Sequence, residues 1–288
     1  MAHLLDGLLV LDFTTALSGP FSTMTLRDLG ARVIKVEQPD VGEGFRRIGP
    51  FFEGQSGYFN SVNRNKRSLV LDLKQPEAQE IIRKLAAKSD VLVEAYRPGA
   101  LEKMGLGAQD LKKVNPKIIY TSVSGFGQTG PDRRRAGVNL IVEAFAGPLS
   151  VTGEPGQRPM RPGVQTADVF GALFATYATL ASLVGAARHG EGRIADVSLV
   201  EASIAAAAWE AAEYLETGQV PQPMGNRHRL TAPYQLFETK DKRYVAIGTP
   251  NDMLFGKLMQ TLKLEHLITD PRFTTYAKRK ANEDDLVP

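Results

Sequence analysis

Short apolar runs alternate with stretches of helical periodicity through the first half of the chain. Five apolar runs predict buried strands, at Leu8–Phe13, Ala31–Glu37, Ser68–Leu73, Val91–Tyr96 and Lys117–Val123. Three periodic stretches predict helices, at Phe21–Leu29, Glu77–Lys88 and Ala108–Val114. This alternation is typical of an α/β protein with a parallel sheet, and the apolar strand centres indicate that helices cover both faces of the sheet.

The second half of the chain is richer in alanine and in long helical stretches. Three helices are predicted, at Asn139–Val151, Thr166–Arg188 and Leu199–Leu215, and one strand at Arg193–Ser198. Residues 218–229 are rich in Pro, Gln and Gly and predict a linker. Beyond them, two strands and a helix are predicted, at Pro233–Glu238, Arg243–Gly248 and Asp252–Thr261. We therefore expect a large domain at 1–217, the linker at 218–229, and a small domain at 230–288.

The composition excludes several kinds of chemistry. The 288 residues include no cysteine, which removes disulfides, cysteine–metal sites and thiol nucleophiles together. The net charge is +3, and basic runs such as 133–135 and 278–280 are short, so no nucleic-acid partner is expected. The N-terminus does not resemble a signal peptide, and the small residues of the long apolar stretch Val169–Ala187 favour a buried helix over a membrane span. We expect a cytoplasmic protein with no membrane partner.

One glycine motif invites a different interpretation. The spacing Gly125-x-Gly127-x-x-Gly130 matches a dinucleotide-binding fingerprint, which would indicate an NAD-dependent oxidoreductase. However, Pro131 and three arginines follow the last glycine, and the motif comes after a late strand rather than the first. A turn or substrate loop is therefore favoured. The four histidines show no metal-ligand spacing, and no P-loop or Gly-x-Ser-x-Gly motif occurs, so no metal site and no serine hydrolase is expected.

Among the carboxylates, Asp168 is unusually isolated. It is the only Asp, Glu, Lys, Arg or His between Pro162 and Ala187, and it stands at the beginning of a strongly apolar predicted helix. Aspartate is favoured at such a place as a helix cap, and position alone favours that interpretation. The alternative is a carboxylate presented to a cleft at the positive end of the helix dipole, where it could act as a nucleophile.

Several stretches together resemble the class III (CaiB/BaiF-type) CoA-transferase family, in order along essentially the whole chain. They are Leu8–Phe13, Ser18-Gly19-Pro20, Leu29–Glu37, Asn63–Ser68, Glu94–Gly99, Gly125–Pro131 and Arg161-Pro162-Gly163, which leads into Asp168. The resemblance implies that Asp168 is the nucleophile. It also implies a Rossmann-like parallel-sheet large domain, a smaller α+β second domain, and a homodimer of interlocked protomers. Family chains are longer, so the second domain is expected to be incomplete here.

The same resemblance implies the substrates and their contacts. Coenzyme A would arrive as an acyl-CoA and leave on a carboxylic acid acceptor, carried between them as an aspartyl-CoA thioester on Asp168, with no metal. A donor for the oxyanion is expected near Gly127. Six residues match family positions around coenzyme A, namely the cations Lys74, Arg97 and Lys103 and the apolar positions Leu71, Tyr96 and Met104. Surface charge and core packing are the ordinary alternatives for these residues. Leu17 and Gln38 replace a polar and a basic contact of some family members.

Two further functions remain open. The family includes α-methylacyl-CoA racemases, which pair an aspartate with a histidine, and that histidine falls on Val138 of this chain. Because valine cannot accept a proton, transfer is favoured over racemisation or isomerisation. The other alternative is a catalytically silent protein that binds coenzyme A.

Overall fold

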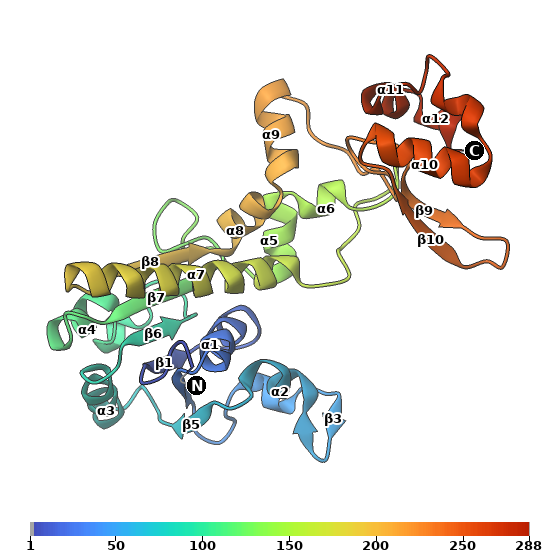
Figure 1. Ribbon diagram of the computed structural model, residues 1–288. Coiled ribbons are helices and arrows are strands. Elements are labelled where there is room, and N and C mark those ends of the chain that lie inside the picture. Colours follow the sequence, from blue (N-terminus) through green and yellow to red (C-terminus); the bar gives the residue numbers. More distant parts are fainter. Residues whose placement is uncertain (1–2, 288) are drawn as a thin grey trace. The chain divides into compact units, whose positions relative to one another are not determined.

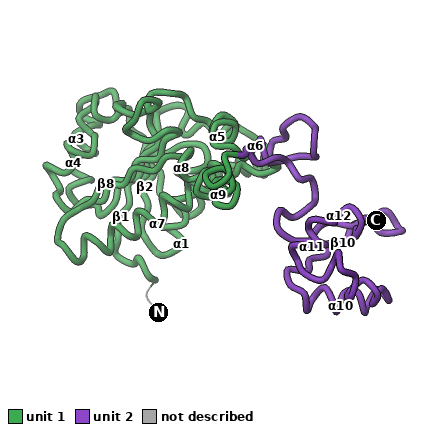
Figure 2. Tube along the Cα trace, turned by 90° about the horizontal axis from the view of Figure 1, so that it is seen from above, with its two compact units in different colours: residues 1–148, 162–218 green, residues 149–161, 219–288 purple. Residues whose placement is uncertain are grey.

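The computed structural model describes residues 3–287, and these form two compact units (Figures 1 and 2). Unit 1 comprises Met1–Pro148 and Pro162–Gly218, and unit 2 comprises Leu149–Arg161 and Gln219–Pro288. Residues 149–161 were predicted to belong to the large domain. They group with unit 2 because they contact it directly, for example through a hydrogen bond from the backbone N–H of Gly225 to the carbonyl oxygen of Gly153 (2.8 Å).

Unit 1 is built on a single parallel sheet (Figure 1). Its strands are β1 (Leu9–Phe13), β2 (Arg32–Glu37), β5 (Arg67–Val70), β6 (Val91–Glu94), β7 (Ile119–Ser124) and β8 (Ile194–Ser198). Their order in space is β5-β2-β1-β6-β7-β8, and every pairing is parallel. This is the doubly wound order in which the chain builds outward from β1 on one side and then on the other. The expected Rossmann-like α/β fold is confirmed.

Helices cover both faces of this sheet. The helices of unit 1 are α1 (Ser18–Asp28), α2 (Gly57–Asn63), α3 (Pro76–Ala86), α4 (Ala108–Val114), α5 (Asn139–Ala146), α7 (Thr166–His189), α8 (Leu199–Ala206) and α9 (Ala208–Thr217). Because successive strand residues point to opposite faces, Val10 and Leu11 belong to two different cores. Val10 packs in the core that includes Leu26 of α1 and residues of α7, and Leu11 packs in the core that includes Ile82 of α3 and Leu111 of α4.

Helix α7 is the central helix of the first face. It packs against α1, β7, β8 and α8, and its small residues Ala167, Ala172 and Ala175 are fully buried. A Cβ added at Gly171 would lie 2.1 Å from Cδ2 of Leu199, so the absence of a side chain there permits the close approach of α8. Within the described residues, α7 is the one helix with the length and composition to cross a membrane. Packing on the sheet accounts for only part of this apolar composition, because 28% of the apolar stretch is buried and side chains such as Leu173 and Tyr177 are exposed.

Two predicted helices are shorter than expected. The helix predicted at 139–151 ends at Gly147, whose φ of +104° is left-handed, and the short helix α6 (Pro148–Val151) follows. The helix predicted at 199–215 is interrupted at Ala207. Residues 38–66, for which no element was predicted, contain a 3-10 helix (Gly44–Arg47), the hairpin β3 (Phe51–Phe52) and β4 (Gln55–Ser56), and α2. These elements are too short to produce a clear periodic pattern.

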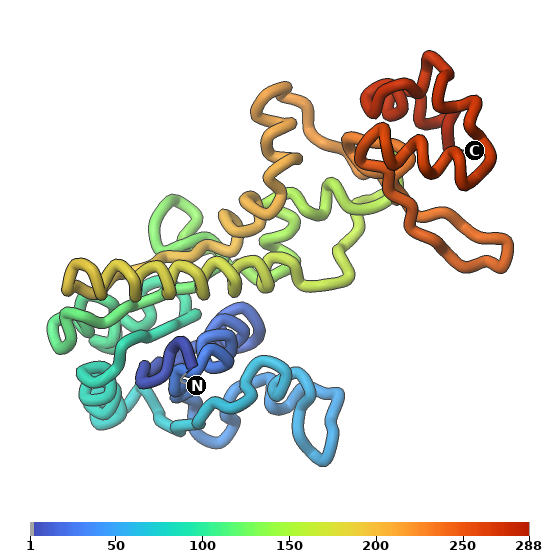
Figure 3. The backbone as a smooth tube through the Cα atoms, in the orientation of Figure 1, coloured from blue at the N-terminus to red at the C-terminus, as the bar shows by residue number. Residues whose placement is uncertain are grey.

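Unit 2 combines a hairpin with short helices (Figure 3). Its elements are β9 (Tyr234–Glu238), β10 (Tyr244–Gly248), α10 (Asp252–Leu262), α11 (Tyr276–Ala281) and α12 (Glu283–Leu286). Phe255, Met259 and Phe273 form its apolar core. Arg279 is fully buried beside this core, where its guanidinium donates hydrogen bonds to the carbonyl oxygens of Ala232 and Phe273.

Candidate active site

A cleft opens at the carboxyl ends of β1 and β6, the two neighbouring strands between which the strand order reverses. Ligands of open α/β sheets bind at this kind of switch point, because the loops that follow the two strands lead away in opposite directions. The cleft measures about 460 Å³. It is lined by loop residues after β1, by residues 95–98 after β6, by the end of β7, and by Asp168. All of these residues belong to unit 1.

A second cavity of about 240 Å³ adjoins this cleft. Thr15, Ala95 and Tyr96 line both cavities, so the two are neighbours that share these residues. Gln38 and the buried carboxylates Glu37 and Glu43 line the second cavity.

Asp168 lies in the first turn of α7 but does not cap that helix. The N-cap is Gln165, so Asp168 is the third helical residue, and no described residue donates a hydrogen bond to its carboxylate. Burial, followed by the negative charge of Glu143, raises the pKa of Asp168 from its ordinary value of 3.8 to about 6. The arrangement is an unpaired, partly desolvated carboxylate that faces the cleft and is ionised at neutral pH.

Donors of Thr166 and Asp168, at the start of α7, are instead bound by side chains of α5. Oε1 of Glu143 accepts hydrogen bonds from the backbone N–H of Thr166 (2.9 Å) and from its hydroxyl (2.6 Å). Oδ1 of Asn139 accepts a hydrogen bond from the backbone N–H of Asp168 (3.2 Å). Neither residue was predicted from the sequence to belong to the site. Their spacing of four places them on one face of a largely apolar helix, and this pattern is the signal that could have indicated them.

Two glycines, Gly125 and Gly137, shape another part of the cleft lining. A Cβ added at Gly137 would lie 2.5 Å from Cα of Gly125, so the two backbone segments pass in direct contact. Beside them, the guanidinium of Arg135 stacks over the rings of Phe126 and Phe145, with centroid distances of 5.7 and 5.1 Å. Together with Arg97 and Arg133, it makes the cleft lining basic.

The structure brings only some of the predicted site residues to the cleft. Tyr96 and Arg97 line it together with Asp168. Leu71, Tyr96 and Met104 all pack against the same core on one face of the sheet. Lys74 and Lys103 are exposed, and neither lines a described cavity.

The glycine motif forms a turn, as predicted. Gly127 and Gly130 have φ values of +80° and +82°. The structure has no helix between Gly130 and the start of α5 at Asn139. Ser124 and Gly125 line the cleft but Gly127 does not. The next backbone N–H, that of Gln128, donates to Oδ2 of Asp196 (2.8 Å).

Val138 lines the cleft, and none of the residues that line it is a histidine. Over the part of the chain that the structure describes, no group of three or more His, Cys, Asp or Glu side chains is arranged to hold a metal ion.

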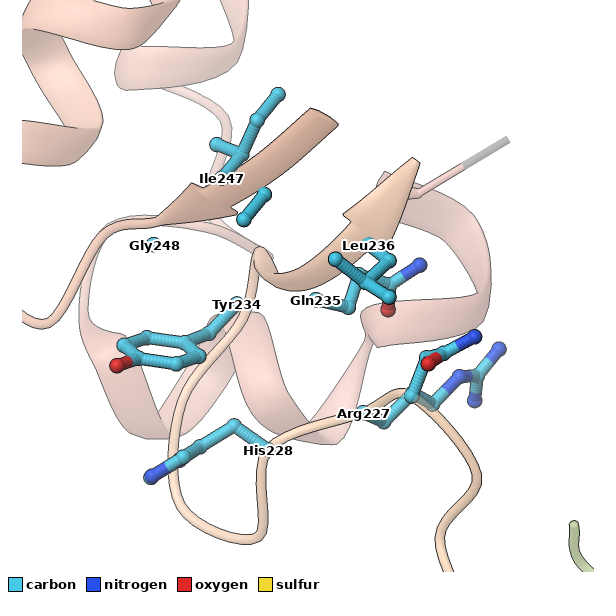
Figure 4. Close-up of a pocket in the computed structure, with 9 residues that line it drawn as sticks. Arg227, His228, Tyr234, Gln235, Leu236, Ile247 and Gly248 are labelled. Carbon is cyan, nitrogen blue, oxygen red and sulfur yellow. The ribbon is translucent and has the colours of Figure 1, made fainter. Parts of the chain in front are cut away.

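Two other cavities lie away from Asp168. A cavity of about 710 Å³, larger than the cleft, lies near the amino ends of β1 and β6 and is lined by Leu8, Asp90 and Lys117 among others. The cavity in Figure 4, of about 350 Å³, lies in unit 2, where Tyr234 packs against His228 with ring centroids 4.6 Å apart. Neither cavity contains a predicted site residue. The smaller cleft at the switch point is therefore the better candidate, because it alone combines an unpaired carboxylate with several cations.

Comparison with known proteins gives a consistent result. The family described as "CoA-transferase family III" matches residues 5–288. The chain is 43% identical over 284 residues to mouse "Succinyl-CoA:glutarate CoA-transferase", covering 98% of this chain and 65% of that protein. It is 41% identical over 282 residues to "Acetyl-CoA:oxalate CoA-transferase" of Acetobacter aceti, covering 98% and 72%. The solved structure of a CaiB/BaiF family protein from Brucella suis superposes with a TM-score of 0.86 at 40% identity, covering 99% of this chain and 76% of that one.

Proposed function

The chain belongs to CoA-transferase family III, and from this premise we propose that it transfers coenzyme A from an acyl-CoA to a carboxylic acid through Asp168. One observation carries the proposal beyond family membership. Asp168 presents an unpaired, partly buried carboxylate to a cleft that is also lined by Arg97, Arg133 and Arg135, and this arrangement suits a nucleophile that acts on an anionic thioester substrate. The chain spans 65% of the length of the mouse relative.

In the proposed reaction a carboxylate oxygen of Asp168 attacks the thioester carbon. The carbon–sulfur bond breaks, coenzyme A leaves as a thiolate, and a mixed anhydride joins the donor acyl group to Asp168. The thiolate then attacks the carboxyl carbon of Asp168, which releases the donor acid as a carboxylate and leaves an aspartyl-CoA thioester. An acceptor carboxylate repeats these steps in reverse. Covalent catalysis of this kind divides one difficult exchange into easier steps and conserves the thioester bond energy.

In this proposal the residues around Tyr96 bind coenzyme A. Arg97, Lys74 and Lys103 would pair with its phosphates, while Leu71, Tyr96 and Met104 would contact its adenine. The positions of Tyr96 and Arg97 in the lining of the cleft support their contact with coenzyme A. Replacing Arg97 with Gln should raise the KM for acyl-CoA with little change in the site of covalent modification.

We further propose that the acceptor is a dicarboxylic acid. The relatives cited above are named for glutarate and oxalate, both of which carry a second carboxylate. Arg133 and Arg135 line the same cleft as Asp168 and could bind that distal group while the first carboxylate attacks. A monocarboxylic acid of equal length should then be a poorer acceptor, and Arg133→Gln should reduce the difference between the two.

We also propose that the protein acts as a homodimer in the cytoplasm, with interlocked protomers. Exposed apolar side chains along α7, including Phe170, Leu173 and Tyr177, support a partner over this face. Light scattering that gave a monomer at micromolar concentration would refute the dimer.

The decisive experiment traps the covalent intermediate. The protein is incubated with acyl-CoA donors and then with hydroxylamine, which converts an aspartyl thioester to a hydroxamate, and the peptide that contains Asp168 is analysed by mass spectrometry. We expect a hydroxamate on Asp168 in the unchanged protein and none in Asp168→Asn. Asp6→Asn, an exposed change of the same kind, should behave as the unchanged protein. Intact coenzyme A binding without any adduct would refute the proposal and favour a silent binding protein. Exchange of an α-proton without transfer would favour an isomerase.

A further inference from the structure

The beginning of α7 lacks a cap of its own. The first turn of a helix has backbone N–H groups without partners inside the helix, and a side chain at the N-cap usually accepts from one of them. The side chain of Gln165, the N-cap of α7, makes no such hydrogen bond. An aspartate in the first turn is well suited to supply the missing acceptor, yet the carboxylate of Asp168 does not do so.

The acceptors come instead from α5, more than twenty residues earlier in the chain. Glu143 accepts from the N–H and the hydroxyl of Thr166, and Asn139 accepts from the N–H of Asp168. These bonds hold the backbone on both sides of Ala167 and satisfy donors that would otherwise compete for the carboxylate of Asp168. The α5 side chains thus fix the position of Asp168 while leaving its oxygens unoccupied.

Glu143 also contributes a charge. Its side chain is fully buried, and its second oxygen, Oε2, has no hydrogen-bond partner among residues 3–287. Arg133 and Arg135 line the neighbouring cleft, but among the described residues neither forms an ion pair with Glu143 or Asp168. The two carboxylates therefore repel each other, and Glu143 adds to the effect of burial in raising the pKa of Asp168.

We propose that Glu143 is a positioning residue for the nucleophile, which caps α7 from α5 and favours acylation of Asp168 by repelling its free carboxylate. The inference rests on the proposed function. When Asp168 becomes an aspartyl-CoA thioester, its negative charge leaves the site on the departing donor acid, and the repulsion from Glu143 ends. Glu143 thereby shifts the equilibrium toward the covalent intermediate, whereas Asn139 and the hydroxyl of Thr166 contribute position alone.

Three variants separate these two roles. Glu143→Gln keeps an amide oxygen that can accept both bonds from Thr166 but removes the charge. Glu143→Ala removes both the bonds and the charge. Thr166→Val removes one bond and keeps the charge. The matched control is Glu191→Gln, which makes the same chemical change at an exposed site just beyond the other end of α7. For each protein the rate of hydroxamate formation on Asp168 is measured against pH, together with the KM for acyl-CoA and the melting temperature.

In Glu143→Gln we expect the midpoint of adduct formation to move from about pH 6 toward the ordinary value for aspartate, with a smaller fraction of enzyme in the covalent form. Glu143→Ala should lose about tenfold or more in rate because its nucleophile is no longer held. Glu143→Gln should recover most of that rate. Thr166→Val should slow the reaction without moving the midpoint.

An unchanged midpoint in Glu143→Gln would overturn the electrostatic role, and an unchanged rate in both Glu143→Ala and Thr166→Val would overturn the positioning role. If Glu143→Ala does not fold, Glu143→Gln and Thr166→Val test the two roles without it. Failure of the proposed function gives a different result, because the unchanged protein and Glu191→Gln would then form no adduct on Asp168 at any pH.

Discussion

Replacing the proposed nucleophile by its neutral isostere should stabilise unit 1. In Asp168→Asn the side chain keeps its shape but loses its charge, which lies partly buried, unpaired and close to Glu143. The pKa of Asp168 is about 6 in the folded protein against an ordinary value of 3.8, so between these two pH values the folded state holds a proton that the unfolded state has lost. The stability of the unchanged protein must therefore fall as pH rises through this window.

The size of the effect follows from the same two pKa values. Their difference is about 2.2, and each pKa unit corresponds to 1.36 kcal/mol, which gives about 3 kcal/mol as the cost of ionising Asp168 in the fold. Below pH 4 both proteins carry a neutral side chain, and their stabilities should be similar. Above pH 6 the variant should be more stable by up to about 3 kcal/mol, with a melting temperature higher by about 2–4 °C for each kcal/mol.

Denaturant unfolding at a series of pH values between 4 and 8 tests this expectation. Unfolding is followed by far-ultraviolet circular dichroism, because Trp209, the only tryptophan of the chain, is 61% exposed on α9 and its fluorescence would respond weakly. Asp6→Asn, at an exposed position, provides the control and should show no pH-dependent gain. A variant no more stable than the unchanged protein at pH 7.5 would refute the reasoning, as would a gain of equal size at pH 4 and pH 7.5.

Three further changes test other parts of the structure. Lys66→Met should destabilise unit 1 by about 3 kcal/mol in denaturant unfolding, because it removes the ammonium that donates to Oδ2 of the fully buried Asp12 (2.9 Å). In Gly137→Ala the new Cβ would displace the cleft wall at Gly125, so the rate of CoA transfer should fall at temperatures where the variant is still folded by its melting curve. A transfer rate equal to that of the unchanged protein would contradict the close contact. Arg279→Met should lower the stability of unit 2 by about 2 kcal/mol, measured by hydrogen exchange of α10 and α11, because two buried carbonyl oxygens lose their donors.

Local pattern was sufficient to predict most of unit 1. The strand predicted at 8–13 is β1, and the helix predicted at 108–114 coincides with α4, because a buried strand and an amphipathic helix each leave a periodic pattern in the sequence. The pattern also predicted one helix where the structure has two, α5 with α6 and α8 with α9. An apolar pattern can continue through an interruption such as Ala207. Residues 149–161 grouped with unit 2 through contacts with residues more than fifty positions later, and periodicity carries no information about such contacts.

The candidate site likewise contains one residue that the sequence identifies and others that only the resemblance or the structure connects with it. Asp168 could be found from the sequence because it is the one charge in a long apolar stretch, and the family resemblance then gave it a role. Tyr96 and Arg97 could be connected with it only through that resemblance, and the structure does bring them into one cleft with Asp168. Lys74 and Lys103 stand apart from the described cavities, so their contact with coenzyme A remains a prediction.

The sequence by itself determined the alternation of strands and helices and the place of Asp168 at the beginning of an apolar helix. The tertiary structure alone decided that Asp168 does not act as a cap. Whether a carboxylate in a helix's first turn is bound by backbone donors or left free depends on which other acceptors reach those donors. Here Glu143 and Asn139 reach them from α5, and only the packing of α5 against α7 brings these groups together.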